Sequence, residues 1–299
     1  MNESVSVIIP NLNSPTIDRT IASLHAQTRA DAIAEIIVVG RDEPGRLPDD
    51  PLVRFVDTHQ PVTAPVARNR GIALAQANVL IFIDADCIAD SKWLEHLLQT
   101  LNTGKDVVSG AMALVRDTYW AVAYNISWFH DFLPSAPAGA RRHLPTSNLL
   151  VRRQVIETVG LLDEELARGQ DTDWTARMVE HGYQLWFAPQ AIVYHHHARR
   201  TAHSIWQQCR QGGAYAAQVR LYHPGVLAAP GILRRPRLLT WFSPLIAALV
   251  SAQIFVRDRA LWPYLPYFPA VYMTKIAWCL GAANPPLRIA APLTGKARR

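Results

Sequence analysis

Apolar residues follow two alternating patterns along the first third of the chain. Short runs rich in β-branched residues occupy positions 5–10, 35–39, 52–56, 79–83 and 107–114, and such runs predict buried strands. Between them, apolar residues with helical spacing lie within 14–27, 64–77 and 90–101, which predicts helices. Strands that alternate with helices predict a mostly parallel sheet with helices on both faces, so the expected fold class is α/β.

The pattern is less regular in the middle of the chain. Positions 132–145 contain three prolines, one glycine and the run Arg141-Arg142-His143, a composition typical of a loop. Two interpretations stay open here: a solvated connection, or an active-site flap whose arginines meet an anionic acceptor. Two short strands are expected next, at 183–187 and 191–194.

The last part of the chain is apolar without the alternation of strands and helices. Nineteen consecutive uncharged residues occupy 238–256, which is long enough to span a bilayer. The next apolar stretch, 260–280, contains three prolines and Lys275, so it either completes a membrane hairpin with both ends in the cytoplasm or lies at the interface. The alternative is a helical subdomain packed on the rest of the protein. We expect a catalytic domain over 1–233 and a basic, apolar helical, membrane-associated tail over 234–299.

Charge separates the same two parts. The chain has a formal charge of +6, but the part from Arg234 onward carries ten Lys and Arg and one acid, Asp258. The first 233 residues hold the other 20 basic and 23 acidic groups, a net charge of −3. This distribution argues against a nucleic-acid-binding body and favours an anionic membrane surface as the partner of the tail.

Cysteine usage and the N-terminus bear on the compartment. Cys87, Cys209 and Cys279 have unrelated spacings, which predict neither a disulfide framework nor a zinc site. Positions 1–5 lack the basic and apolar regions of a signal peptide. We therefore expect a reducing, cytosolic environment.

Two carboxylates end the most apolar of the predicted strands. Asp84 and Asp86 follow the run 79–83, and ligands in open α/β sheets bind beyond the carboxyl ends of the strands. Alternate residues of an extended chain point the same way, so both carboxylates can face one ligand. A hard divalent cation that carries phosphate oxygens would relieve their repulsion. The alternative is a strand-end turn in which an aspartate caps a helix.

Two later polar clusters have similar alternatives. Asp171 lies at the expected start of a helix, where it is either a functional acid or the N-cap. His195, His196 and His197 follow the predicted strand 191–194, and they either include a metal ligand or are surface residues only.

In combination these stretches resemble the family 2 glycosyltransferases, which have the GT-A fold. The matching pieces occur in the family's order over roughly residues 4–215: Val5-Ser-Val-Ile-Ile-Pro-Asn-Leu-Asn13, Glu35-Ile-Ile-Val-Val39, Ala67-Arg-Asn-Arg-Gly71, Phe82-Ile-Asp-Ala-Asp-Cys87, Ser147-Asn148, Gly160-Leu-Leu-Asp163, Gly169-Gln-Asp-Thr-Asp173 with Arg177, and Val193-Tyr-His195.

The resemblance implies metal-dependent transfer of a sugar from a nucleotide-diphosphate sugar, with inversion at the anomeric carbon. Asp86 would ligate Mg²⁺ or Mn²⁺, and Asp84 would help to hold the metal or the ribose. Asp171 would be the catalytic base, and His195 would lie near the metal and the diphosphate.

The resemblance also implies a nucleotide pocket lined by Pro10, Asn11 and Asn13, with Arg68 near the donor phosphates. Two positions depart from the family pattern. Gln170 replaces the glutamate that usually precedes the base, and Gly40-Arg41-Asp42 stands where an Asp-Asp pair usually recognises the nucleotide base. Asp42 is expected to take over that role with a shifted register.

We therefore expect a transferase of the hexosyltransferase type that adds single sugars to a lipid-linked or polysaccharide acceptor at the cytoplasmic face of the cell membrane, in cell-envelope polysaccharide biosynthesis. A UDP-sugar is the favoured donor. Two other classes stay open: a catalytically silent nucleotide-sugar-binding partner subunit, and a nucleotidyltransferase on a similar sheet. The latter typically carries a glycine-rich basic loop after its first strand, where this chain has Pro10-Asn-Leu-Asn13.

Overall fold

The computed structural model describes residues 3–197 and 199–285. These residues form two compact units, each made of two separate parts of the chain. Unit 1 comprises the chain up to Ala113 and the segment Ala138–His196, and unit 2 comprises Leu114–Pro137 and the chain from His197 onward. The predicted division between positions 233 and 234 falls within unit 2. That a catalytic domain ends there and a tail begins stays a prediction.

Unit 1 is built on a nine-stranded sheet. Its strands are β1 (Val5–Leu12), β2 (Ile33–Arg41), β3 (Val53–Asp57), β4 (Val79–Ile83), β5 (Cys87–Ala89), β6 (Val107–Ala113), β7 (Gly139–Arg141), β8 (Asn148–Arg152) and β9 (Leu185–His195). The strand order is β3-β2-β1-β4-β8-β6-β9-β5, and β7 pairs with β9 outside this path.

The first half of the sheet is parallel and the second half is mixed. The strands β3, β2, β1 and β4 pair in parallel, so their carboxyl ends meet at one edge of the sheet. Strand β8 then runs antiparallel to both β4 and β6, while β6 and β9 are parallel. The expected α/β class with a mostly parallel sheet flanked by helices is confirmed.

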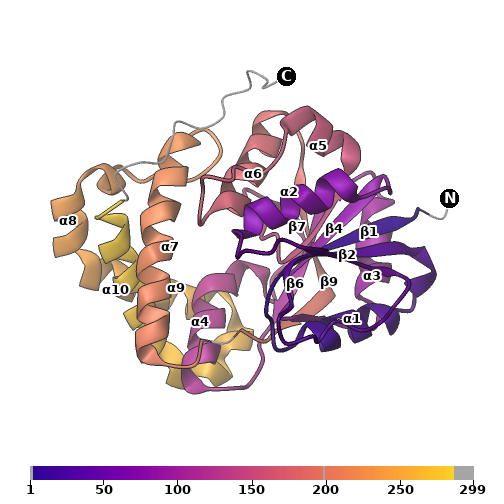
Figure 1. The fold of residues 1–299 in the computed structure, drawn as a ribbon. Coiled ribbons are helices and arrows are strands. Elements are labelled where there is room, and N and C mark those ends of the chain that lie inside the picture. The colour runs from indigo at the N-terminus through magenta and orange to yellow at the C-terminus, as the bar shows by residue number, and fades with distance from the viewer. Residues whose placement is uncertain (1–2, 198, 286–299) are drawn as a thin grey trace. The chain divides into compact units, whose positions relative to one another are not determined.

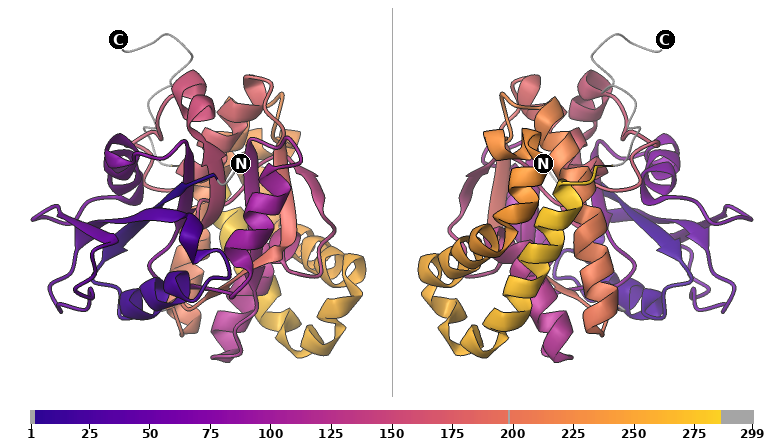
Figure 2. Two further views of the ribbon diagram at one scale, coloured as in Figure 1. Left: turned by 90° about the vertical axis from the view of Figure 1, so that its right-hand side faces the viewer. Right: turned by 90° about the vertical axis from the view of Figure 1, so that its left-hand side faces the viewer.

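Helices cover both faces of this sheet (Figures 1 and 2), with α2 on one face and α1 and α3 on the other. Each of the three follows a strand of the first half of the chain. The helices of unit 1 are α1 (Ile17–His25), α2 (Ala64–Leu74), α3 (Trp93–Leu101), α5 (Arg153–Val159) and α6 (Gln170–Glu180), with a short 3-10 helix, η1 (Ala30–Ala32).

Two sequence-based expectations differ from the structure in this unit. The segments 183–187 and 191–194 do not form separate strands but belong to one strand, β9, because β6 pairs with it on both sides of an irregularity in register. The segment 132–145 is not wholly a loop, since Gly139–Arg141 pairs with β9 as β7. Both differences come from backbone partners that are distant in the sequence.

Unit 2 is helical. It contains α4 (Tyr119–Phe129), α7 (Ala202–Tyr222), α8 (Pro236–Trp241), α9 (Ser243–Arg257) and α10 (Phe268–Ala282), with the 3-10 helices η2 (His130–Phe132), η3 (Gly231–Arg234) and η4 (Arg259–Tyr267). One core cluster joins α4, α9, η4 and α10 through residues such as Val122, Ile254, Leu261 and Val271.

Helices α7 and α10 lie side by side (Figure 2) at a separation that only glycine permits. A Cβ on Gly213 would come within 2.1 Å of the Trp278 carbonyl oxygen, and one on Gly281 within 1.8 Å of the Arg210 carbonyl oxygen. A side chain at either position would force the two helices apart, so the glycines set the spacing of this pair.

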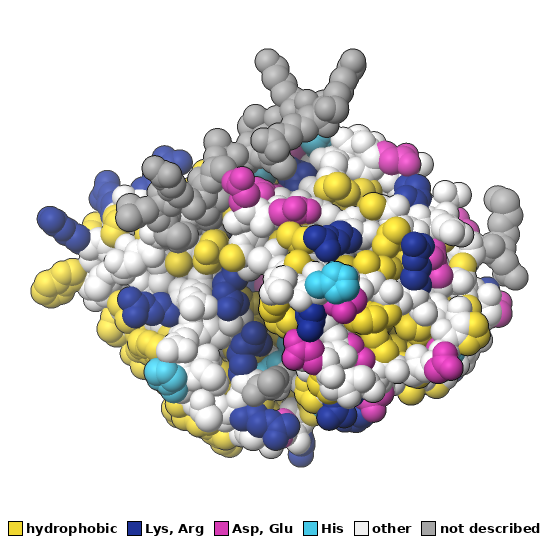
Figure 3. Space-filling view, in the orientation of Figure 1, with side chains coloured by type: hydrophobic (Ala, Val, Ile, Leu, Met, Phe, Trp, Pro, Cys, Tyr) yellow, Lys and Arg dark blue, Asp and Glu magenta, His cyan; other side chains and the backbone are white. Residues whose placement is uncertain are grey.

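The predicted bilayer span over 238–256 is divided between α8 and α9, and Pro244 stands at the start of α9. Among the described residues, none of the helices combines the length and the apolar character that crossing a membrane requires. The surface over α8 instead carries hydrophobic side chains next to Lys and Arg side chains (Figure 3). The basic C-terminal cluster, Lys296 to Arg299, on which the expected hairpin also depended, lies outside the described residues.

Candidate functional site

Asp84 and Asp86 lie in a tight turn that connects β4 to β5. The backbone N–H of Cys87 donates to the carbonyl oxygen of Asp84 over 3.0 Å, which closes this turn. Helix α3 begins later, at Trp93 with Lys92 as its N-cap, so the strand-end turn of the alternative is present, but the expectation that an aspartate caps a helix there is wrong. Both carboxylates are half-buried, at 30% and 31% exposure, and remain accessible to a ligand.

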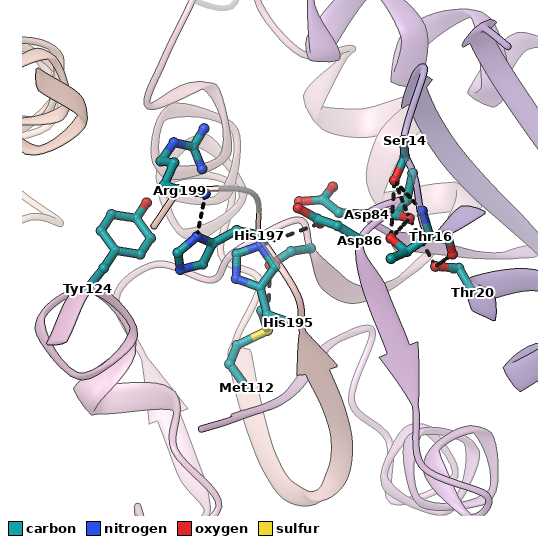
Figure 4. Close-up of polar contacts among 12 residues, drawn as sticks. Ser14, Thr16, Thr20, Asp84, Asp86, Met112, Tyr124, His195, His197 and Arg199 are labelled. Carbon is teal, nitrogen blue, oxygen red and sulfur yellow. Dashed lines mark hydrogen bonds and ion pairs between the residues drawn. The ribbon is translucent and has the colours of Figure 1, made fainter. Parts of the chain in front are cut away.

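Three hydroxyl groups hold the residue between the two aspartates. Ser14 Oγ, Thr16 Oγ1 and Thr20 Oγ1 donate to the Ala85 carbonyl oxygen over 2.9, 3.1 and 3.0 Å. Figure 4 shows the three side chains gathered beside Asp84 and Asp86. Because one carbonyl accepts from two donors on the connection between β1 and α1 and from a third on α1 itself, the turn has little freedom to move away from these segments.

Arg68 provides the positive charge of the site. Its side chain, on α2, is only 4% exposed, and Nη2 lies 2.6 Å from Asp84 Oδ1. The Arg68 Nε and Nη1 atoms are buried without a hydrogen-bond partner among the described residues. A buried guanidinium with two unused donors is an energetically costly arrangement unless an anion completes it, and it matches the phosphate oxygens of a nucleotide.

His195 reaches Asp86 from the end of β9. The backbone places it there, because β9 pairs with β5 and aligns His195 with Cys87, and the His196 N–H donates to the Asp86 carbonyl oxygen over 2.7 Å. The Nε2 atom of His195 lies 3.4 Å from Asp86 Oδ1, as Figure 4 shows. His195 is buried at 8% exposure, so the interpretation of the histidine run as surface residues only is wrong for this position.

The chemistry of the donor set fits a divalent cation. Asp86, Cys87 and His195 each offer one atom, and these atoms lie within 4.8 Å of one another. Burial first, and the charges of Asp86 and Asp84 next, raise the pKa of the Cys87 thiol well above its usual range, which disfavours a thiolate. The carboxylate and the imidazole remain, and a carboxylate is a ligand that suits Mg²⁺ and Mn²⁺.

Asp171 is the second residue of α6, after the left-handed N-cap residue Gly169, so the N-cap interpretation of Asp171 is wrong. Its Oδ1 accepts a hydrogen bond of 2.8 Å from the Thr172 N–H. Burial raises the pKa of Asp171, the charge of Arg68 opposes that rise, and the charge of Asp84 adds to it. The aspartate therefore lies within electrostatic range of Arg68 and Asp84 despite its distance along the chain.

The predicted nucleotide-pocket residues lie where β1 and β2 end side by side. Pro10 and Asn11 pair with Val39 and Gly40, and Asn11 Nδ2 donates to the Arg41 carbonyl oxygen over 2.7 Å. A side chain at position 40 would come within 1.8 Å of the Asn11 carbonyl oxygen. This clash explains why no acidic residue can stand at position 40.

The first acid after β2 is Asp42. Its Oδ2 accepts from the Leu47 N–H over 2.9 Å, and its buried Oδ1 has no hydrogen-bond partner among the described residues. Asn13, with a left-handed φ of 55°, accepts from the Glu43 N–H over 2.9 Å. The side chains of Asn11 and Asn13 thus shape this end of the sheet, and the buried Oδ1 atom of Asp42 is the acceptor that these contacts leave without a partner among the described residues.

The structure brings most of the predicted residues together and adds three that sequence reasoning missed. Arg68 forms an ion pair with Asp84, His195 lies 3.4 Å from Asp86, and the charges of Arg68 and Asp84 act on the pKa of Asp171. The missed residues are Ser14, Thr16 and Thr20. Thr20 carried a signal, because it lies on the buried side of α1 among Ile17, Ile21 and Leu24, where a hydroxyl needs a hydrogen-bond partner.

The chain is similar to relatives with known names. The chain is 32% identical over 203 residues to a glycosyltransferase, AglE, of Haloferax volcanii, a match that covers 64% of this chain and 66% of the relative. It is 28% identical over 182 residues to a pre-mycofactocin glycosyltransferase of Mycobacterium tuberculosis, which covers 58% of this chain and 38% of that protein. The chain thus matches just under two thirds of the length of the first relative and little more than a third of the second.

Solved structures show the same fold. A mannosyltransferase from Pyrobaculum calidifontis, in complex with GDP-Man and Mn²⁺, has a TM-score of 0.64 at 18% identity over 94% of this chain and 86% of its own. GalNAc-T7, with UDP, GalNAc and Mn²⁺, has a TM-score of 0.54 at 16% identity over 76% of this chain and 52% of its own. The family model of the family 2 glycosyl transferases matches residues 6–160, which is more than half of the chain. The chain therefore belongs to glycosyl transferase family 2.

Proposed function

We propose that this protein transfers a sugar from a nucleotide-diphosphate sugar to an acceptor hydroxyl with inversion at the anomeric carbon. One observation carries the proposal: Arg68, Asp84, Asp86, His195 and Asp171 come from separate segments and gather beyond the end of β4. The site combines three features. Arg68 has hydrogen-bond donors for phosphate, Asp86 and His195 offer an oxygen and a nitrogen ligand for a cation, and Asp171 is a carboxylate with a raised pKa. A metal-dependent transfer with direct displacement by the acceptor hydroxyl uses all three.

Each residue has a role that follows from its contacts. Asp86 and His195 would hold Mn²⁺ or Mg²⁺, with Asp84 nearby, and the bound cation would neutralise charge that develops on the departing diphosphate. Arg68, oriented by Asp84, would donate from Nε and Nη1 to the same diphosphate. Asp42 would accept a hydrogen bond from the nucleotide base.

Asp171 is the proposed general base. As the acceptor oxygen forms a bond to the anomeric carbon, the bond from that carbon to the diphosphate oxygen breaks and the leaving oxygen keeps the electron pair. The acceptor proton passes to the Asp171 carboxylate. Burial raises the pKa of this group, which makes it a stronger base than an exposed aspartate.

The acceptor and the location are further parts of the proposal. The apolar and basic residues of 234–259 support a lipid-linked acceptor, or a polysaccharide made there, at the cytoplasmic face of the cell membrane. A UDP-sugar is the first donor to test. GDP-sugars belong in the same panel, because the two solved structures named above hold UDP in one case and GDP-Man in the other.

Donor hydrolysis by the purified full-length protein tests the proposal without knowledge of the acceptor. We would incubate it with UDP- and GDP-sugars and Mn²⁺ or Mg²⁺, measure release of the nucleoside diphosphate, and follow the first anomer of the freed sugar by NMR. Asp86→Ala and Asp171→Asn should lose turnover. Asp18→Asn, at an exposed acid of α1, is the matched control and should retain it.

The outcomes separate the alternatives. Metal-dependent release with inversion supports the proposal. Metal-dependent donor binding with no turnover, even with lipid and glycan acceptors, would support a silent binding subunit. Pyrophosphate release from a sugar phosphate and a nucleoside triphosphate would support a nucleotidyltransferase. Absence of metal-dependent donor binding would contradict the proposed role of Asp84 and Asp86 in binding the cation and the donor.

A further inference from the structure

Large hydrophobic side chains are exposed in one region of unit 2. Of the thirteen large hydrophobic residues that are exposed in the described chain, eight lie between Leu238 and Leu265. Trp241 is 83% exposed, Val256 is 75% exposed and Leu249 is 63% exposed. Single exposed hydrophobic residues are ordinary, but a concentration of this kind marks a binding surface.

Helix α9 is apolar on two opposite faces. Ala247, Ser251 and Ile254 are buried on one side, and Ile254 packs in the core cluster with α4 and α10. Leu245, Leu249 and Val256 repeat at intervals of four and seven residues on the other side, so they form one stripe of the helix. A helix that only covers a core would carry polar residues along this outer stripe.

The elements next to α9 in the sequence also carry exposed hydrophobic side chains. Trp241 ends α8, and Trp262 and Leu265 belong to η4, at 54% and 50% exposure. We define the apolar face as Trp241, Leu245, Leu249, Val256, Trp262 and Leu265. Tryptophan is enriched where apolar and aqueous environments meet, because its ring is largely apolar and carries one polar N–H.

Exposed arginines lie close in sequence to the residues of the apolar face. Arg235 and Arg237 precede Trp241 in the sequence, and Arg257 and Arg259 lie in the sequence between Val256 and Trp262, all of them exposed. Between positions 234 and 285, which are all described, Asp258 is the one acidic residue. Asp258 caps η4 through the Ala260 N–H, and it also accepts a hydrogen bond from Ser135. The segment 234–285, which carries the apolar face, is therefore strongly positive.

We propose that the apolar face lies on the surface of an anionic lipid bilayer. The six apolar side chains would insert below the headgroups, and the flanking arginines would keep their long stems at the interface while the guanidinium groups contact phosphates. In Figure 3, hydrophobic and basic side chains adjoin over α8 as this arrangement requires. The proposal deepens the proposed function, since it names the surface that would bring the enzyme to a membrane acceptor.

Charge and shape favour a bilayer over two other partners. A second copy of this chain that met the same face would bring arginine against arginine with almost no acid to compensate. A polyanion such as a nucleic acid would satisfy the arginines but leave Trp241, Leu249 and Val256 in water. An anionic bilayer is the partner that offers negative charge and an apolar interior together.

Vesicle flotation with the full-length protein tests the surface. We would compare vesicles of phosphatidylcholine alone with vesicles that also contain phosphatidylglycerol, at low and high salt. The wild type should bind the anionic vesicles and lose affinity as salt rises. Leu249→Asp should weaken binding by about tenfold or more, because an inserted leucine is replaced by a charge. Arg235→Gln with Arg237→Gln should weaken it by about fivefold for each arginine.

Leu161→Asp is the matched control. It places the same charge at an exposed leucine of unit 1, at 46% exposure, and should bind vesicles like the wild type. Circular dichroism and thermal melts would show that each variant is folded. Equal binding by Leu249→Asp and Leu161→Asp, or no binding of the wild type to either vesicle, would overturn the proposal.

Two further readouts make the test specific. The wild type could self-associate and fail to bind vesicles, with the self-association lost in Leu249→Asp. That result would assign the face to a second copy of the chain and overturn the proposal. Donor hydrolysis in the absence of vesicles should be equal in Leu249→Asp and the wild type. Vesicle binding without donor turnover would contradict the proposed function and leave the membrane surface supported, so the two failures can be told apart.

Discussion

Arg68 and Asp84 form an ion pair of 2.6 Å between the buried face of α2 and the end of β4. Asp84 thereby uses one oxygen to orient the guanidinium, and the Nε and Nη1 atoms of Arg68 remain as donors. An oriented guanidinium recognises a diphosphate through several donors at once, which a single ammonium group does not.

The first prediction concerns this ion pair. Arg68→Lys should raise the KM for the donor by about tenfold or more, because one charge-assisted hydrogen bond is worth about 1.5–3 kcal/mol and lysine cannot replace the fork. Arg68→Gln should be weaker still in donor binding, measured by calorimetry with Mn²⁺. Arg70→Gln, at an exposed arginine of the same helix, is the control. Equal donor affinity in Arg68→Lys and the wild type would contradict a role for the fork.

The end of β4 could be predicted from the sequence because its neighbours bury the strand completely. All five residues of β4 are buried, so the strand appears as a continuous apolar run that stops at Asp84. The order of β8, β6 and β9 could not be predicted, since antiparallel partners such as Leu150 and Ile81 are chosen by packing between distant segments. Strand β7 could not be predicted from its proline-rich segment either, because its partner β9 is distant in the sequence.

The residues of the site also divide into those that the sequence could indicate and those that it could not. Asp84 and Asp86 could be singled out from the sequence because ligands in open α/β sheets bind beyond the ends of the strands, whereas the expected roles of Asp171, Arg68 and His195 came from the family resemblance. The position of Thr20 on the apolar side of α1 indicated that its hydroxyl needs a hydrogen-bond partner, but not which partner. Its role depends on the Ala85 carbonyl oxygen, 3.0 Å away, and a backbone acceptor has no signature in the sequence.

The second prediction concerns that hydroxyl. Thr20 is fully buried, so Thr20→Val keeps its shape and removes one of three donors to the Ala85 carbonyl oxygen. We expect a loss of about 1 kcal/mol in the free energy of unfolding, together with weaker Mn²⁺ binding because the turn that carries Asp86 is less fixed. Thr20→Ser should restore both properties. Melting temperature and Mn²⁺ titration measure the two effects, and unchanged Mn²⁺ affinity in Thr20→Val would limit the hydroxyl to a structural role.

The third prediction concerns the metal ligands. Asp86→Asn and His195→Gln should each weaken Mn²⁺ binding by about tenfold or more, as the loss of a ligand or of its close partner typically does. Chelation should abolish turnover, and added Mn²⁺ should restore it.

Cys87→Ala distinguishes this ligand set from one that includes the thiol. The Cys87 side chain is completely buried and burial raises the pKa of its thiol, so the variant should lower stability but leave Mn²⁺ affinity unchanged. A loss of Mn²⁺ affinity in Cys87→Ala equal to that in His195→Gln would show that sulfur is a ligand.

The fourth prediction follows from the environment of Asp171. Burial raises the pKa of this aspartate above its ordinary value of 3.8, and a general base acts only when it is deprotonated. The acid limb of the kcat profile should therefore lie above pH 3.8 and should disappear in Asp171→Asn, whose residual activity should be lower by at least about a hundredfold. An acid limb that persists in the residual activity of Asp171→Asn would assign the base to another residue.

The raised pKa of Asp171 also lowers the stability of the folded protein, although it makes the carboxylate a stronger base. A raised pKa in the folded state means that the charged carboxylate is penalised by folding, so stability falls as pH rises from the pKa of the unfolded chain through that of the folded protein. Asp171→Asn removes this penalty and keeps an acceptor oxygen for the Thr172 N–H, which now donates over 2.8 Å. The variant should therefore melt at a higher temperature than the wild type near neutral pH, with a difference that shrinks as the pH is lowered. A lower melting temperature at neutral pH would show that the charged carboxylate stabilises the start of α6 more than its burial costs.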